Sequence, residues 1–263
     1  MNAEGFLRLD DLDSCKKDLF DQIKKSPGDV KLRIFLFQLS CITEDWNRAL
    51  GQLEVIRDLD DSALALVNTY TQLISCEKKR QDVLQGKINV TCFGQPPSWL
   101  AYYTQAYEQT LNGKFESAIE LITKGAEHAP QISGFIDKET PFEWLCDGDL
   151  RFGPVIEIIL NGGYYWLPME NILKLEFEPV EDLRDLVWRP VNLTLKNKGT
   201  LIGFVPVRYP INDMATNSHL LAKTCDWSEP TEHLYIGTGQ RIFISESKEF
   251  PLLDISSIEF NLV

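Results

Sequence analysis

One short segment carries the residue types that acid–base or metal chemistry needs. "CDGDLRFG" brings Asp147, Asp149 and Arg151 together. Paired aspartates can bind Mg²⁺ or act as acid and base. A solvated turn with a neighbouring salt bridge explains the same three residues, and it is the interpretation that we favour. A small-ligand or metal site in this part of the chain, with Arg241 as a further member, stays open as the alternative.

The other candidates for a metal or nucleotide site are weaker. His219, Cys225 and His233 lie within fifteen residues, but their spacing matches no zinc motif and no fourth ligand is evident. "GTGQR", which ends at Arg241, has two glycines but no helix after it, so a hairpin turn is favoured over a phosphate loop. The sequence has no P-loop and no Ser or Cys in a nucleophile elbow. We therefore expect a protein that is not an enzyme and that holds no cofactor and no metal.

The stretch "EDLRDLVWRP", residues 181–190, suits binding better than catalysis. In one interpretation Trp188 packs on the strand-rich part of the chain. In the other, Trp188 is an exposed aromatic anchor beside Arg184, since tryptophan and arginine are enriched in binding hot spots. Both interpretations stay open at this point. The candidate partner-binding residues are Arg184, Asp185, Trp188, Arg151 and Arg241.

Composition and charge limit the classes of partner. The 263 residues include 26 Lys and Arg against 39 Asp and Glu, a net charge of −13. Such acidity repels phosphate backbones and anionic lipid, so we expect no nucleic acid and no membrane as partner, and a basic protein segment instead. No stretch approaches the roughly 20 apolar residues that cross a bilayer. The N-terminal sequence lacks the features of a signal peptide, and the six cysteines are scattered, so we expect a reduced, cytoplasmic chain.

Small residues recur in the first 130 positions at the spacing of a helical repeat. Cys15, Ala49 and Ala118 stand at equivalent points of three helical stretches, 34 and then 69 residues apart. A period of 34 is that of the tetratricopeptide repeat, a helix–turn–helix unit. Only the last stretch has the second small residue of that unit, Gly125. We predict a degenerate tetratricopeptide-like repeat over residues 1–130, with an irregular helical bundle as the alternative.

Helix boundaries within this part follow from capping residues. Asp45 is a predicted N-cap, and residues 62–85 are predicted to form one helix that Ser62 caps. The partner of that helix is replaced by "GKINVTCFGQPP", where glycine and proline prevent a regular helix. We expect one hairpin to have lost its second helix.

After residue 130 the pattern changes to short apolar runs separated by turn signals. Residues 131–140 are a predicted linker. Residues 155–168 are predicted to form a hairpin around Asn161-Gly162-Gly163, because Asn-Gly between apolar runs suits the positive φ of a two-residue turn. A second hairpin is expected around residues 197–199, a third over residues 233–246, and edge strands beginning at Ile172 and Leu253. The predicted fold is α+β, with a small antiparallel, partly barrel-like β domain over residues 141–263.

Several motifs together resemble a known family. "RIFLFQL", "PFEW..D.D.R.GPV.E", "NG.YYW.P", "EDLRDLVW.P" and "FPLLD" are similar to the ImpE family, the SciE-type or TagJ accessory proteins encoded with bacterial type VI secretion systems. The resemblance runs from about residue 6 to about residue 258, and residues 141–190 are its most specific part. Cys15 stands where the family usually has alanine.

The resemblance implies a function that spacing alone does not. Members of the family look like non-enzymatic, virulence-associated accessory factors that grip the N-terminal segment of the small contractile-sheath subunit. They are thereby expected to influence sheath assembly or its recycling. No active-site residues are carried over. The sequence leaves two alternatives open, a ligand-binding or enzymatic β domain and a purely structural oligomer.

Overall fold

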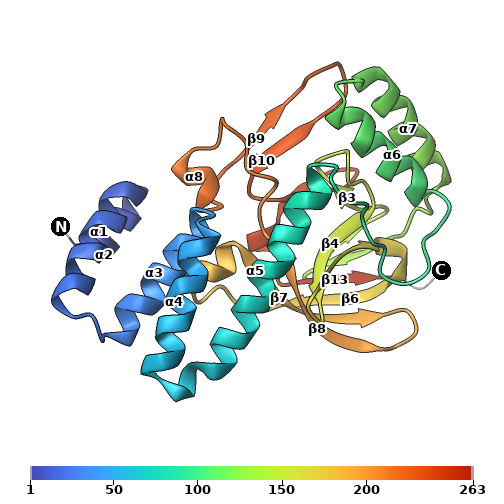
Figure 1. The fold of residues 1–263 in the computed structure, drawn as a ribbon. Coiled ribbons are helices and arrows are strands. Elements are labelled where there is room, and N and C mark those ends of the chain that lie inside the picture. The colour runs from blue at the N-terminus through green and yellow to red at the C-terminus, as the bar shows by residue number, and fades with distance from the viewer. Residues whose placement is uncertain (1, 262–263) are drawn as a thin grey trace.

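The computed structural model describes residues 2–261. Apart from the short helix α8 (Asn217–Leu220) and three 3₁₀ turns, its helices precede its strands (Figure 1). The first half of the chain is helical. Its elements are α1 (Ala3–Arg8), α2 (Leu12–Lys25), α3 (Val30–Ile42), α4 (Trp46–Leu59), η1 (Asp61–Ala63), α5 (Leu64–Leu84), α6 (Leu100–Leu111) and α7 (Phe115–His128).

Aspartate side chains start several of these helices, as capping chemistry requires. The Asp45 carboxylate accepts a hydrogen bond from the Arg48 backbone N–H, which confirms its predicted role as N-cap of α4. The prediction that Ser62 caps α5 is wrong. Ser62 lies inside the 3₁₀ turn η1, and the carboxylate of Asp60 accepts the bond from its backbone N–H. α5 has no side-chain N-cap and instead continues directly from the 3₁₀ turn η1.

The helices pack as sequential pairs, α1 with α2, α3 with α4, and α6 with α7. Cys15, Ala49 and Ala118 lie in the second helix of each pair and are fully buried, so the predicted hairpins are confirmed. α5 has no partner helix of this kind and is followed by the predicted loop. Paired helices alone do not establish a tetratricopeptide superhelix, and that finer assignment stays a prediction.

The largest sheet has eight antiparallel strands in the order β2-β1-β13-β6-β7-β8-β4-β5. Its strands are β1 (Gly134–Ile136), β2 (Thr140–Phe142), β4 (Val155–Leu160), β5 (Gly163–Pro168), β6 (Ile172–Phe177), β7 (Trp188–Leu195), β8 (Thr200–Pro206) and β13 (Ser257–Phe260). The β4–β5 hairpin is confirmed, with Asn161 and Gly162 at positive φ. The β7–β8 hairpin is confirmed as well, and Lys198 has positive φ in its turn.

Other predictions for the strands are wrong. β6 and β13 are interior strands, because β13 pairs with both β1 and β6 and β6 also pairs with β7. β10 (Ile236–Gly239) pairs with β9 (Cys225–Ser228), whereas β11 (Ile242–Ile244) pairs with β12 (Glu249–Pro251) and β3 (Cys146–Asp147). The segment that contains "GTGQR" therefore connects two sheets and is not a hairpin turn.

The barrel-like closure that the sequence suggested is absent from residues 2–261. The end strands β2 and β5 lie at opposite edges of an open sheet. The outer edge of β5 is occupied by the loop after α5. There the Trp166 N–H donates to the Thr91 carbonyl (3.0 Å) and the Phe93 N–H donates to the Trp166 carbonyl (2.9 Å). This loop pairs the outward backbone N–H and C=O of Trp166, two of the groups that a closing strand would otherwise pair.

The helical and strand-rich parts share a hydrophobic core. The ring centroids of Trp46 on α4 and Trp188 on β7 lie 5.6 Å apart, and Tyr70 on α5 packs on Phe204 of β8. β1 and the start of β2 occupy residues that were predicted to be a linker. Residue 130 thus separates most of the helices from the strands but does not separate two cores, and a division into two domains there stays a proposal.

β4 explains why the shared core contains charge. All six of its residues are buried, because one face meets the helices and the other meets a second cluster under β11 and β12. Val155 and Ile159 point to the helix side, and Ile156 and Ile158 to the opposite side. Since side chains alternate along a strand, Glu157 also faces the helices and needs partners there.

Candidate functional site

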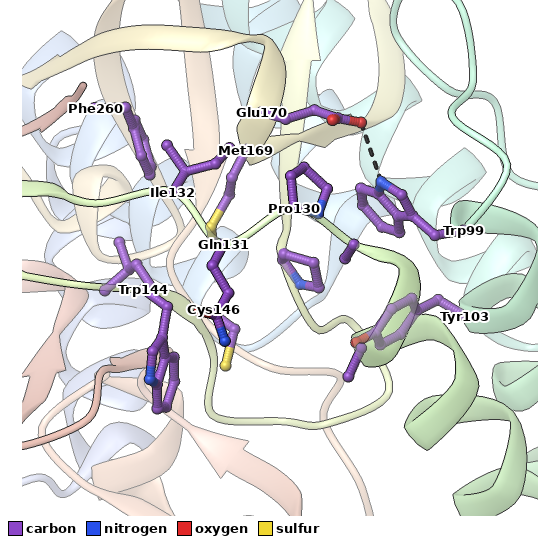
Figure 2. Close-up of a pocket in the computed structure, with 14 residues that line it drawn as sticks. Trp99, Tyr103, Pro130, Gln131, Ile132, Trp144, Cys146, Met169, Glu170 and Phe260 are labelled. Carbon is purple, nitrogen blue, oxygen red and sulfur yellow. Dashed lines mark hydrogen bonds between the residues drawn. The ribbon is translucent and has the colours of Figure 1, made fainter. Parts of the chain in front are cut away.

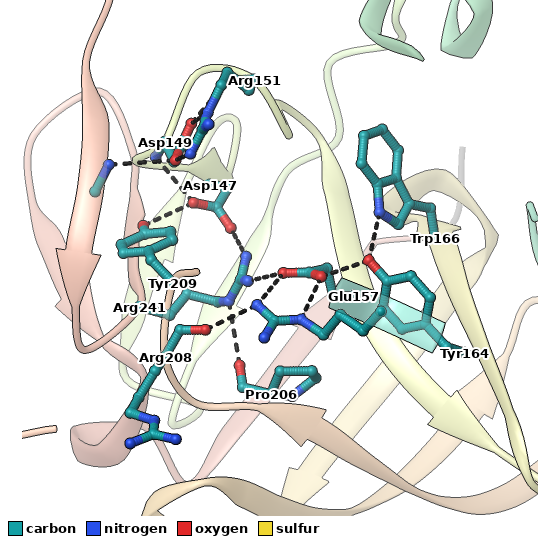
Figure 3. Close-up of polar contacts among 12 residues, drawn as sticks. Asp147, Asp149, Arg151, Glu157, Tyr164, Trp166, Pro206, Arg208, Tyr209 and Arg241 are labelled. Carbon is teal, nitrogen blue, oxygen red and sulfur yellow. Dashed lines mark hydrogen bonds and ion pairs between the residues drawn. The ribbon is translucent and has the colours of Figure 1, made fainter. Parts of the chain in front are cut away.

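A buried ionic network centres on Glu157 and joins α5 to the sheet (Figure 3). The Glu157 carboxylate accepts hydrogen bonds from Arg80 Nε (2.8 Å) and Arg80 Nη2 (3.1 Å). It also accepts one from the Tyr164 hydroxyl (2.5 Å), and it forms an ion pair with Arg241. Burial alone would raise the pKa of this carboxyl, but Arg80 and Arg241 together lower the pKa of Glu157 to about 2. Glu157 is therefore a fixed anion inside the protein.

The network extends from Arg80 to β7. Arg80 Nη1 donates to Glu77 (2.8 Å), one turn earlier on α5, and Arg80 Nη2 also donates to the Arg208 carbonyl (2.9 Å). The other Glu77 carboxylate oxygen accepts a hydrogen bond from Trp188 Nε1 (2.9 Å). Arginine has five donors in a planar fork, so a single residue can hold α5 against several strands.

On the other side, Arg241 connects Glu157 to Asp147 (Figure 3). Asp147 also accepts hydrogen bonds from the Tyr209 hydroxyl (2.7 Å) and the Asp149 backbone N–H (2.9 Å). Burial raises the pKa of Asp147 to about 7, and Arg241 offsets only part of this effect. Asp149 in turn accepts from Arg151 Nε (2.8 Å) and Nη2 (2.5 Å).

This geometry corrects the predicted character of the "CDGDLRFG" segment. The expected salt bridge is present, but the turn is not solvated, because Asp147 and Asp149 are fully buried. Their carboxylates form ion pairs with arginines and accept hydrogen bonds from a tyrosine hydroxyl and from backbone N–H groups. Within residues 2–261 there is no cluster of three or more His, Cys, Asp or Glu side chains that could hold a metal ion. The charged side chains of the network are thus buried and bonded to one another.

The five predicted partner-binding residues lie mostly inside the protein. Trp188 is fully buried, so the prediction of an exposed aromatic anchor is wrong. It is packed, as the other interpretation expected, but its ring packs on Trp46 and Tyr70 of the helical part. Asp185 is buried in η3 (Leu183–Leu186) and accepts from the backbone N–H of Asp182 (2.9 Å). Arg184 lies over the Tyr70 ring, 4.8 Å from its centroid.

Arg151 and Arg241 complete this set, and they are 7% and 0% exposed. Both belong to the ionic network, where each pairs with buried aspartate. Direct contact with a partner would need these two arginines at the surface. Among the five residues, only Arg184 retains a side chain about one-fifth exposed, and it forms an ion pair with Asp182.

Within residues 2–261, the three residues of the weak zinc pattern do not form a group that could hold a metal ion. His219 is buried in α8 (Asn217–Leu220), where its Nδ1 accepts from the Thr216 N–H (3.0 Å). The His233 side chain is exposed and lies 3.4 Å from the Glu232 carboxylate. Cys225 begins β9 and is part-buried.

A pocket of about 260 Å³ lies where the α6–α7 hairpin meets the sheet (Figure 2). It is mostly aromatic and apolar. Its lining residues are Trp99, Tyr103, Ala126, Ala129, Pro130, Gln131, Ile132, Trp144, Leu145, Cys146, Pro154, Met169, Glu170 and Phe260. Glu170 is the one charged residue among them, and Ala126, Pro130 and Gln131 reach the surface. The pocket is thus an apolar recess with a single carboxylate at its side.

The walls of this pocket are held rigidly. Tyr103 lies between two glycines, since a Cβ at Gly125 would be 2.6 Å from its ring and a Cβ at Gly153 would be 2.2 Å from it. Trp99 meets Tyr103 edge to face, with ring centroids 5.8 Å apart. The Trp99 Nε1 donates to Glu170 Oε1 (3.1 Å; Figure 2). The second small residue of the helical repeat, Gly125, therefore makes room for a pocket wall.

Sequence reasoning missed this pocket because its lining comes from distant segments. They include the start of α6, the end of α7, the residues after β2, η2 (Met169–Asn171) and β13. No periodicity or motif places Trp99 beside Glu170, 71 residues later. The one available signal was the pair Ala118 and Gly125, which indicates close helix packing but no recess.

Comparison with known proteins gives three findings. A family model described as "ImpE protein" matches residues 139–259. A Pseudomonas aeruginosa protein named "Type VI secretion system accessory component TagJ" is 40% identical over 261 residues, which cover 99% of this chain and 91% of that protein. A crystal structure of a Vibrio parahaemolyticus protein has a TM-score of 0.88 at 24% identity, covers 98% of this chain and 97% of that one, and shows the same fold. No helix within residues 2–261 is long and apolar enough to cross a membrane.

Proposed function

This chain belongs to the ImpE family, and we propose that it is a non-enzymatic accessory protein of a type VI secretion system. In this proposal it binds a segment of the small contractile-sheath subunit in the cytoplasm and so modulates sheath assembly or recycling. The observation that carries the accessory role is the 40% identity, over 99% of the chain, to the P. aeruginosa accessory component.

The interior of the protein supports binding over catalysis. Glu77, Arg80, Asp147, Glu157 and Arg241 are buried and paired with one another. Acid–base catalysis needs a titratable group within hydrogen-bond reach of a substrate. Here Asp147 and Glu157, the two carboxyls with strongly shifted pKa values, are enclosed and already bonded, so these shifts reflect a structural network.

The charge of the chain supports the kind of segment that we propose. A net charge of −13 attracts a basic segment and repels acidic surfaces. If the segment of the sheath subunit is basic, its affinity falls as salt screens the attraction. An affinity that stays constant with salt would remove the electrostatic part of the proposal.

The test is a pull-down with the full-length chain, because the helical and strand-rich parts share a core and cannot be separated without exposing it. Purified small sheath subunit is compared with the same subunit lacking its N-terminal segment. We expect capture of the intact subunit and loss of capture without the segment. A matched subunit whose N-terminal segment has been scrambled controls for length and charge. Equal capture of all three, or of none, would refute the proposal.

A further inference from the structure

The pocket beneath the α6–α7 hairpin has the size and chemistry to receive a protein side chain (Figure 2). At about 260 Å³ it falls below the roughly 300–1,000 Å³ of typical small-molecule and cofactor sites. Trp99, Tyr103, Trp144 and Phe260 give it aromatic walls, and Met169 lies among them. A recess of this kind suits the single aromatic or large aliphatic anchor that dominates many protein interfaces.

The negative charge at the pocket favours a basic residue next to the anchor side chain in the bound segment. Glu170 is the only charged lining residue, and one of its oxygens is already engaged by Trp99. Glu143 directly precedes the lining residue Trp144, and its backbone N–H donates to the Glu246 carboxylate (3.2 Å). Glu170 is therefore the carboxylate that lines the pocket, and the overall net charge of −13 adds to its attraction for a cation. An anchor followed by a lysine or arginine matches this arrangement, and an acidic neighbour is repelled.

Backbone pairing at the edges of the eight-stranded sheet is a poorer way to bind a segment. Among the described residues, β2 forms one edge, and it has three residues of which Pro141 has no N–H to donate. The other edge, β5, is already paired at Trp166 with Thr91 and Phe93. A partner is thus recognised better by a side chain in the pocket than by adding a strand to this sheet.

From this geometry we infer that the pocket is the docking site for an apolar anchor side chain followed by a basic residue, presented by a short segment of a partner protein. The pocket is preformed, because Tyr103 is fixed between Gly125 and Gly153 and Trp99 is fixed by Glu170. A preformed wall reduces the ordering cost of binding. Naming the sheath subunit as the source of the segment rests on the proposed function, whereas the pocket and its ligand chemistry do not.

Two substitutions test the docking site without removing a buried side chain. Ala126 on α7 is exposed and lines the pocket, so Ala126→Trp places an indole at the mouth; Ala65→Trp, at an exposed alanine of α5, is the matched control. Glu170→Gln removes the charge and keeps an oxygen for Trp99 Nε1; Glu54→Gln, on exposed α4 surface, removes the same charge elsewhere. Circular dichroism of each variant checks that it is folded.

The first experiment uses a probe that needs no identified partner. Binding of 2-phenylethylamine, an aromatic ring with a cation, is measured by saturation-transfer NMR and compared with 3-phenylpropanoate, its anionic counterpart. We expect the amine alone to bind and Ala126→Trp to abolish its signal. Glu170→Gln is expected to weaken binding about fivefold, which corresponds to about 1 kcal/mol for a half-exposed ion pair. No amine binding, or equal binding by Ala126→Trp, would overturn the inference.

The second experiment uses a synthetic peptide of the sheath subunit's N-terminal segment and fluorescence anisotropy. If the native protein binds the peptide and Ala126→Trp does not, while Ala65→Trp does, the pocket and the proposed function both hold. If Ala126→Trp and Glu170→Gln bind the peptide as the native protein does, the pocket is refuted and the proposed function stands. If the amine binds and the peptide does not, the proposed function is refuted and the docking site stands.

Discussion

The substitution Arg241→Met tests whether the buried ionic network stabilises the folded protein. Arg241 is fully buried and pairs with Asp147 and Glu157, which are also fully buried. Its guanidinium lies 4.9 Å from the ring centroid of Phe152 and 5.0 Å from that of Tyr209. Methionine is flexible and unbranched, so it can fill most of the same space. The change therefore removes charge and hydrogen bonds while it leaves little cavity.

The expected loss of stability depends on which buried carboxylates lose a cation when Arg241 is removed. Without Arg241, Asp147 keeps a hydroxyl and a backbone N–H but loses its cation, and Glu157 keeps Arg80 as its one cation. Breaking a buried ion pair by removing one partner typically costs about 3–5 kcal/mol. We expect a loss of stability in this range, which corresponds to an unfolding equilibrium constant raised at least about 100-fold.

Urea unfolding followed by circular dichroism measures this loss, with Lys24→Met as the matched control. Lys24 pairs with Asp21 at the surface, where both side chains are more than half exposed, so that variant should unfold like the native protein. The midpoint of Arg241→Met should fall while the m-value stays constant. A loss below about 1 kcal/mol would refute the structural role, because a buried charge without compensation costs more than that.

Three further predictions concern the same framework. Trp188→Phe removes the hydrogen bond to Glu77 and leaves that buried acceptor unpaired, so thermal or urea unfolding should show a loss of about 1–3 kcal/mol. The pKa of Asp147 is about 7 in the folded state and 3.8 in an unstructured chain, so between these pH values the folded state binds one more proton. The free energy of unfolding should therefore decrease by about 1.4 kcal/mol per pH unit as pH rises through this window, and Asp147→Asn should lack that slope in urea titrations. Gly153→Ala, at φ +59° and with its Cβ 2.2 Å from Tyr103, should destabilise by more than about 1 kcal/mol in calorimetry, and a neutral result would contradict the tight packing around Tyr103.

Local signals in the sequence predicted local structure well. Asn161-Gly162 predicted the β4–β5 hairpin because positive φ at a two-residue turn is decided by those two residues. Cys15, Ala49 and Ala118 predicted the helical hairpins because a small side chain is needed wherever two helices approach closely.

The sequence did not predict which residues far apart in the chain would contact one another. Glu157 and Arg241 are 84 residues apart, and nothing near either one indicates that it will meet the other inside the protein. Trp188 is ambiguous in its own segment, and its burial depends on Trp46 and Tyr70 from the helical part. The order of the strands could not be predicted for the same reason, since β13, near the C-terminal end of the chain, pairs between β1 and β6.

The pocket could not be predicted from the sequence either, because it depends on contacts between distant segments. Its walls come from both the helical and the strand-rich parts, so its existence depends on how the two parts pack. Gly125 was visible in the sequence as a small residue of a repeat, but its contact with Tyr103 was not. The residues that the sequence favoured for binding were chosen by type, and the burial that decided their role is a property of the whole fold.

Site-specific photo-crosslinking to the small sheath subunit tests the proposed docking site most directly. A benzophenone amino acid is placed at Ala126 in the pocket mouth, and in a parallel protein at Ala65 on α5. After irradiation with purified sheath subunit, mass spectrometry locates the crosslinked residues. We predict a crosslink from position 126 to the N-terminal segment of the subunit and none from position 65. No crosslink from position 126, or the same crosslinks from both positions, would contradict the account.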